Sequence, residues 1–158
     1  MPARRPELNV EPGVLEWLRD DLTHADPHAP ARLTADLHRC ARELGWTPVG
    51  GSHLDSMTGV WRQTLLSPFS QQEVRMLAHT DWPLLAFTDA AHPGATFAPY
   101  LNPPGLTAWW QARGWIVPDA AWLNGTPDRA DLDRLTPGTA KGARHLGFSR
   151  GDLLFQYW

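Results

Sequence analysis

Cysteine and lysine are almost absent from this chain of 158 residues, which contains one of each. Because Cys40 has no second cysteine to pair with, no intrachain disulfide can form and a metal cluster built from thiolates is excluded. The chain contains 13 arginines but only one lysine, Lys141. We interpret this as a bias of composition, because no cluster of basic residues requires it. The net charge of −3 argues against a surface that is built as a whole for nucleic acid.

Targeting and membrane signals are also missing. Residues 1–12 have no apolar core of the kind that a signal peptide needs. Residues 90–112 lack charged side chains, but four prolines and two glycines interrupt them and would break a membrane-spanning helix. We therefore expect a cytoplasmic protein, with a flexible arm at 1–11 and one globular domain at 12–158.

Apolar periodicity predicts mainly helices in the first half of the chain. Apolar residues recur three and four positions apart in three segments, at 12–23, 33–44 and 54–65, and a fourth helix is predicted at 71–79. The fourth has the strongest local support, because Ser70 and Glu73 have the spacing of a capping box. Gly45 is well placed to end the second helix, and residues 46–51 are expected to be a short strand or an extended turn.

The second half is predicted to be mixed. Residues 82–89 are typical of a buried strand, with which 96–101 can pair. Pro103 or Pro104 suits the start of a helix that ends near Gly114, and Thr126 with Pro127 suits the start of another. The expected fold class is α+β, a single helix-rich domain with a small sheet of short strands.

Tryptophan is the most unusual feature of the composition, with nine residues against two tyrosines. Several aromatic residues fall within the uncharged region and just after it. Exposed, they would form a stacking platform for a ligand or a partner; buried, they would hold an irregular segment in place. Adjacent helical positions differ by about 100°, so we expect Trp109 or Trp110 to face solvent. The candidate contact residues are Tyr100, Trp109, Trp110 and Trp115.

The C-terminal segment carries a second candidate. Ala143 is a small residue where two helices could touch, Gly147 permits a sharp turn, and Ser149 can cap a following helix. Leu146 and Leu153 are expected to fill the core between the helices. Residues 139–158 resemble the Fis-type helix-turn-helix on this pattern.

That resemblance implies duplex DNA binding. The residues that it places near DNA are Lys141, Arg144, Ser149 and Arg150, within a stretch (134–150) that contains no acid. Gly138 and Gly142 weaken the first helix, however, and the apolar residues 152–158 favour a buried terminal strand. A helix, a turn and a strand are therefore the preferred prediction, and a helix-turn-helix is the alternative.

A fainter resemblance links residues 36–57 to the barstar family of ribonuclease inhibitors, in which a helix ending in Leu-Gly-aromatic precedes a glycine and a helix containing Leu-Asp. The matching residues are Leu44, Gly45, Trp46, Gly51, Leu54 and Asp55. Val49 and Gly50 replace expected aromatic residues, and Gly59 replaces an inhibitory acid. The usual first strand of the family is also missing.

Two catalytic arrangements are weak. Histidine and aspartate in the patterns H-x-D-x-H and H-x-D could ligate a divalent metal if two loops met, and these residues are His24, Asp26, His28, His79 and Asp81. Ser52, His53 and Asp55 have the residue types of a hydrolase triad, but neighbours in an extended segment point to opposite faces. No cysteine nucleophile is expected, since Cys40 lies on an apolar stripe.

The favoured hypothesis is a non-enzymatic binding or accessory protein that holds a partner protein or a small ligand on the aromatic, uncharged surface at about 89–122, without a cofactor. One alternative is a DNA-binding regulator that contacts nucleic acid through residues 134–150. Another is a metal-dependent hydrolase.

Overall fold

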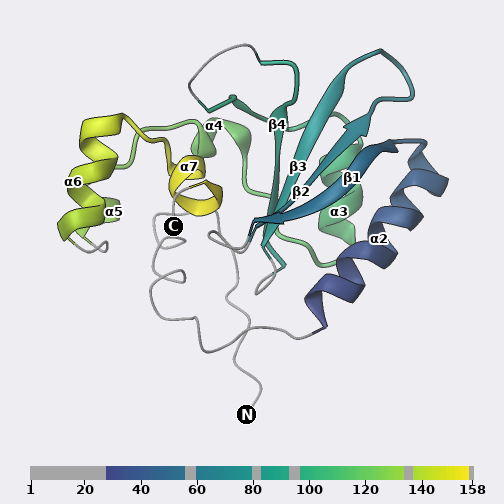
Figure 1. Ribbon diagram of the computed structural model, residues 1–158, viewed down its shortest axis with the longest axis horizontal. Coiled ribbons are helices and arrows are strands. Elements are labelled where there is room, and N and C mark those ends of the chain that lie inside the picture. The colour runs from purple at the N-terminus through teal and green to yellow at the C-terminus, as the bar shows by residue number, and fades with distance from the viewer. Residues whose placement is uncertain (1–27, 56–59, 80–82, 93–96, 134–136, 157–158) are drawn as a thin grey trace.

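The computed structural model describes residues 28–55, 60–79, 83–92, 97–133 and 137–156 (Figure 1). Within these ranges no helix is both long and apolar enough to cross a bilayer. The predicted arm and the predicted helix at 12–23 lie outside the described residues. In chain order the elements are α2 (Ala29–Leu44), β1 (Thr47–Asp55), β2 (Val60–Leu66), β3 (Glu73–His79), β4 (Leu85–Asp89), β5 (Tyr100–Leu101), α3 (Leu106–Ala112), α4 (Ala120–Leu123), α5 (Arg129–Asp133), α6 (Pro137–Leu146) and α7 (Arg150–Phe155).

The centre of the fold is a five-stranded antiparallel sheet in the order β1-β2-β3-β4-β5, so each strand pairs with the next one along the chain. The α+β class is therefore confirmed. The expectation of a small sheet is wrong, because β1, β2 and β3 contain nine, seven and seven residues. The strands predicted at 82–89 and 96–101 are present as β4 and β5, and they pair as expected.

The helices predicted at 54–65 and 71–79 are wrong, because both segments contribute strands. In β3, Val74 and Met76 face one side of the sheet and Leu77 faces the other, and all three are buried. Burial on both faces removes the alternation that identifies a half-buried strand. Ser70 caps no helix: its hydroxyl accepts the N–H of Gln72 at 3.3 Å in the turn before β3.

Helices cover both faces of the sheet and form a three-layer arrangement (Figure 1). On one face lie α2 and α3, whose buried residues belong to the first core cluster: Leu33, Cys40, Trp46, Leu65, Val74, Met76, Ala78, Leu85, Phe87, Leu106, Trp109, Trp110, Trp115 and Val117. On the other lie α4 and α7, and these two helices contribute together with α6 to the second: Val60, Leu77, Leu84, Ala86, Tyr100, Leu123, Ala140, Ala143, Leu153, Leu154 and Phe155.

Local sequence signals explain how two helices begin or end. The helix α2 starts at Ala29, four residues before the predicted helix at 33–44, and it ends as predicted at Gly45, whose φ of 78° favours glycine. Asp128, and not the predicted Thr126, precedes α5. Its carboxylate accepts the N–H of Asp131 at 2.8 Å while Asp131 accepts the N–H of Asp128 at 2.9 Å, a reciprocal cap.

The edge strand β1 contains an irregularity between Val49 and His53, where its pairing with β2 shifts. Gly50 lies there with a φ of 71°. The buried side-chain amide of Gln63, on β2, donates to the carbonyl oxygens of Val49 at 3.2 Å and Gly50 at 3.3 Å. The bulge is therefore held by specific hydrogen bonds from the neighbouring strand.

Candidate binding surface

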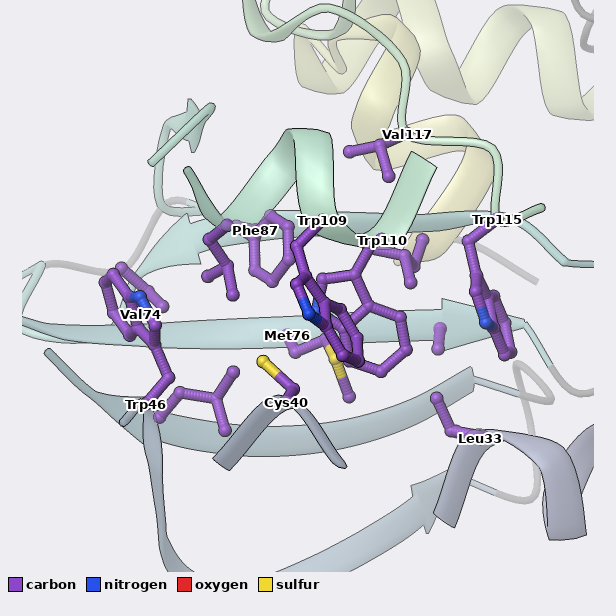
Figure 2. Close-up of a cluster of buried hydrophobic side chains, with 14 residues drawn as sticks. Leu33, Cys40, Trp46, Val74, Met76, Phe87, Trp109, Trp110, Trp115 and Val117 are labelled. Carbon is purple, nitrogen blue, oxygen red and sulfur yellow. The ribbon is translucent and has the colours of Figure 1, made fainter. Parts of the chain in front are cut away.

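The aromatic residues predicted to contact a partner are buried in this chain. Tyr100, Trp110 and Trp115 are each no more than 2% exposed, and Trp109 is 9% exposed. The expectation that one of the adjacent tryptophans faces solvent is wrong. Trp109 packs under Arg113 while Trp110 points into the sheet, and their ring centroids are 5.2 Å apart in an edge-on arrangement (Figure 2). Because α2 packs over this region, the side chains of both Trp109 and Trp110 are buried.

Two acids on α2 accept the indole N–H groups of Trp109 and Trp115, which this packing buries, whereas the buried N–H of Trp110 has no hydrogen-bond partner among the described residues. Trp109 donates to Glu43 and Trp115 donates to Asp36, each at 2.8 Å. The two acids are seven residues apart, two helical turns, and therefore lie on one face of α2. The guanidinium of Arg113 also donates to Glu43, at 2.6 Å. The hydrogen bond from Trp109, with the charge of Arg113 nearby, lowers the pKa of Glu43.

Cys40, on α2, lies in the same interior beside the indole of Trp110 (Figure 2). Burial raises the pKa of its thiol to about 11, although the N–H of Trp110 and the charge of Arg113 oppose this rise. A thiol with this pKa is almost entirely protonated at neutral pH, which makes it a poor nucleophile. Its place among apolar side chains agrees with the expectation of a buried hydrophobic residue.

The C-terminal segment folds as helix, turn and helix. The preferred prediction of a terminal strand is therefore wrong: Ser149 accepts the N–H of Asp152 at 3.2 Å and Asp152 accepts the N–H of Ser149 at 3.0 Å, a capping box that starts α7. Gly147 makes the turn with a φ of 68°, and Ala143 and Leu153 are buried as expected. Leu146, expected in the core, is 60% exposed.

The second helix of this motif is largely interior, since all residues from Gly151 to Phe155 are buried. Arg150 donates from Nε to the buried carboxylate of Asp131 at 2.9 Å, lies 3.6 Å from Asp128, and is only 16% exposed. Its guanidinium also lies 5.2 Å from the ring of Trp122. The arginine at the start of α7 therefore connects α5 to α7.

Other residues of the DNA-binding hypothesis are placed differently. Lys141 and Arg144 are exposed on α6, and Ser149 is half-buried with its hydroxyl engaged in the cap of α7. DNA binding remains a prediction that depends on Lys141 and Arg144. For the fainter resemblance, α2 ends at Leu44 as the barstar pattern implies, but Leu54 and Asp55 belong to strand β1 and not to a helix.

The metal hypothesis receives no geometric support from the residues that are described. His28 precedes α2 on the surface, whereas His79 is buried at the end of β3, where its Nε2 bonds to the carbonyl of Leu154 and its ring lies 5.2 Å from that of Phe155. Within the described ranges no three His, Cys, Asp or Glu side chains gather as metal ligands. His24, Asp26 and Asp81 lie outside these ranges.

Polar contacts fix α7 to the sheet at one end of the strands. Tyr100 donates its hydroxyl to Asp152 at 3.3 Å, and Arg62 donates to Gln156 at 3.2 Å. Burial, together with the nearby charge of Asp152, raises the pKa of Tyr100. Burial also raises the pKa of Asp152 itself, although hydrogen bonds from Ser149 and Tyr100 oppose it.

The other end of the same strands is less well covered. Val60 and Leu77, beside α7, are fully buried, whereas Leu66 is half-buried and Val49 is 39% exposed on the same side of the sheet. Figure 1 shows α7 at the lower end of the strands, with the β2–β3 hairpin rising beyond it. We call this region, which no helix of the described residues covers, the turn-face; it comprises the β2–β3 turn (67–72), Val49, Leu66 and Arg75.

Phe69 stands at the tip of the turn-face and is 89% exposed. Three hydrogen bonds hold the turn around it: Ser67 N–H donates to the carbonyl of Gln72 at 2.9 Å, Phe69 N–H to the Ser67 hydroxyl at 3.2 Å, and Gln72 N–H to the Ser70 hydroxyl. The site was not predicted, because the sequence pattern placed a helix cap at Ser70, the residue that follows Phe69. The Ser-Pro-Phe-Ser run at 67–70, typical of a turn, was the available signal.

No protein-family model matches the chain, and comparison with curated proteins and with solved structures also gives no match.

Proposed function

We propose that the chain is a protein-binding module and that the turn-face is its contact surface. The observation that carries this proposal is the exposure of Phe69 on a turn that its own hydrogen bonds hold in place. An apolar phenyl ring is not stabilised by exposure to water. In many interfaces an aromatic side chain that enters a pocket of the partner supplies a large share of the binding free energy.

The neighbours of Phe69 support the same proposal. Val49 and Leu66 add partly exposed apolar area, and Arg75 adds a cation of the kind that is enriched at interface centres. The prior ordering of the turn also favours binding, because a rigid surface loses less conformational entropy when a partner docks. The class of function therefore remains the one that the sequence favours, with its surface moved from 89–122 to the turn-face.

A photocrosslinker placed at position 69 tests the proposal in cells that make the protein. Phe69→p-benzoylphenylalanine is compared with the same replacement of Leu146, an exposed apolar residue on α6. We expect one discrete adduct from position 69 that is absent from position 146. The partner identified from this adduct should then be purified by itself. It should bind the wild-type chain at least about tenfold more tightly than it binds the Phe69→Ala variant.

The same variants supply the controls. Phe69→Ala should leave the melting temperature unchanged, because the ring is almost fully exposed and surface substitutions usually alter stability by less than about 0.5 kcal/mol. Leu146→Ala should bind the purified partner as the wild type does. Equal adducts at positions 69 and 146, or a partner that binds Phe69→Ala as tightly as the wild type, would contradict the proposal.

A further inference from the structure

A row of five paired residues crosses the whole sheet and includes Val49 and Arg75 of the turn-face. Successive strand pairings place these five residues directly opposite one another, and directly paired residues lie on the same face of a sheet. This face is the one that α7 partly covers, since Tyr100 belongs to that core cluster. The row consists of Val49, Thr64, Arg75, Thr88 and Tyr100.

Arg75 occupies the middle of this row, on the central strand β3, with a threonine on either side. Its side chain is half-buried. It forms no ion pair or side-chain hydrogen bond with any residue that the structure describes. Glu73, two residues earlier on the same face, is exposed and does not pair with it.

Three of the other half-buried arginines in the described ranges have side-chain acceptors, and a fourth, Arg32, lies over the ring of Trp115 at 5.0 Å. Arg113 donates to Glu43, Arg150 to Asp131, and Arg62 to Gln156. Asp89 cannot serve Arg75 in this way, because it pairs with Val74 and therefore lies on the opposite face of the sheet. Arg75 differs from these four arginines because the described residues give it neither an acceptor nor an aromatic ring.

We infer that Arg75 binds a carboxylate on an acidic segment of the partner protein, laid across the turn-face. The planar fork of a guanidinium matches a carboxylate in a bidentate geometry. The residues around Arg75 favour a peptide over a phosphate backbone, because Val49 and Leu66 offer apolar contact where phosphate binding uses repeated cations. The inference rests on the proposed function and adds the chemistry of the partner.

Nuclear magnetic resonance of the full chain tests the inference with three probes: an acetylated and amidated Glu-Leu-Glu-Leu-Glu-Leu peptide, its Gln-Leu counterpart, and inorganic phosphate. We expect saturable shifts with the glutamate peptide at the Arg75 side-chain N–H and at the amides of Val49 and Thr64. Arg75→Met should weaken this binding about tenfold or more. Arg144→Met, on the exposed face of α6, should leave it unchanged.

The outcomes separate this inference from the proposed function. Equal shifts with the glutamine peptide or with phosphate, or binding that Arg75→Met does not weaken, would overturn the carboxylate assignment, while the crosslinking result at Phe69 would still stand. If the peptide depends on Arg75 but the cellular partner binds Phe69→Ala normally, the proposed function fails and the carboxylate site remains. A melting temperature for Arg75→Met equal to that of the wild type confirms that the variant is folded.

Discussion

The two faces of the sheet are closed in different ways. On the α2 side, a 16-residue helix and a layer of indole rings cover the strands, and the buried N–H groups of Trp109 and Trp115 bond to acids of that helix. On the α7 side, the described helices that contact the strands are α4 and α7, of four and six residues. Polar contacts from Tyr100 and Arg62 fix α7 at one end only.

The two faces differ in how far they are covered because their helices differ in length. At 1.5 Å per residue, α2 is about 24 Å long and matches the length of a strand, whereas α7 spans about 9 Å. The shorter helix closes the end of the sheet near Val60 and leaves the end near Leu66 as the turn-face. The exposed region is thus a consequence of helix length. Substitutions on the two faces should therefore differ in how much stability they remove.

The largest effect is expected from the indole layer. Trp110→Ala should lower the free energy of unfolding by about 3–5 kcal/mol, because the side chain is fully buried. Trp122→Ala makes the same substitution on the other face, where the ring is only partly buried, and should cost less than half as much. Urea denaturation measures both. Equal losses would show that the two faces do not differ in this way.

A medium effect is expected at the contact between α7 and β5. Gly151→Ala would place a methyl group in steric overlap with the Tyr100 ring, so α7 must shift, at a cost of about 1–3 kcal/mol. Gly138→Ala is the matched control, because it lies in α6 with open space around it and should stabilise by up to about 1 kcal/mol. Thermal unfolding of both variants measures the difference; a neutral Gly151→Ala would show that this contact is not tight.

The smallest effect is a difference in pH dependence. The lowered pKa of Glu43 contributes stability that is present above the ordinary glutamate pKa of about 4.3 and is lost as pH falls. The raised pKa of Asp152 acts oppositely: relative stability is present below the ordinary aspartate pKa of about 3.9 and is lost as pH rises through the folded value.

Glu43→Gln and Asp152→Asn should therefore change the pH profile in opposite directions. Between pH 3 and 7, the stability of the wild type relative to Glu43→Gln should increase with pH, and that relative to Asp152→Asn should decrease. Urea titrations across this range measure both slopes. Slopes of the same sign would mean that the two carboxyl groups do not occupy the contrasting environments described.

Sequence alone predicted those elements whose signals were local. Gly45 ended α2, residues 82–89 gave β4, and the α+β class followed. It failed where burial on both faces hid a strand, as at Val74–Leu77, and where an isolated capping pattern at Ser70 was satisfied by a turn instead. Ser149 carried a real capping signal, but the apolar residues behind it suggested a strand, since a sequence does not show whether an apolar run is buried as helix or sheet.

The candidate site was less accessible still. Exposure of Phe69 depends on a turn between strands that were assigned to helices, and the isolation of Arg75 depends on which residues its neighbours on β2 and β4 happen to be. Both are properties of strand register, which periodicity does not supply. The burial of Trp109 and Trp110 together likewise depends on the position of α2, a contact between segments about 70 residues apart.

The bulge in β1 has a consequence for the behaviour of the chain at high concentration. An outer strand with a straight run of free amide and carbonyl groups is a template on which another molecule can add its own strand and start a fibre. Here Gln63 draws two carbonyl groups of β1 inward and Gly50 bends its path. We therefore expect this irregular outer strand to be a poor template for the strand of a second molecule.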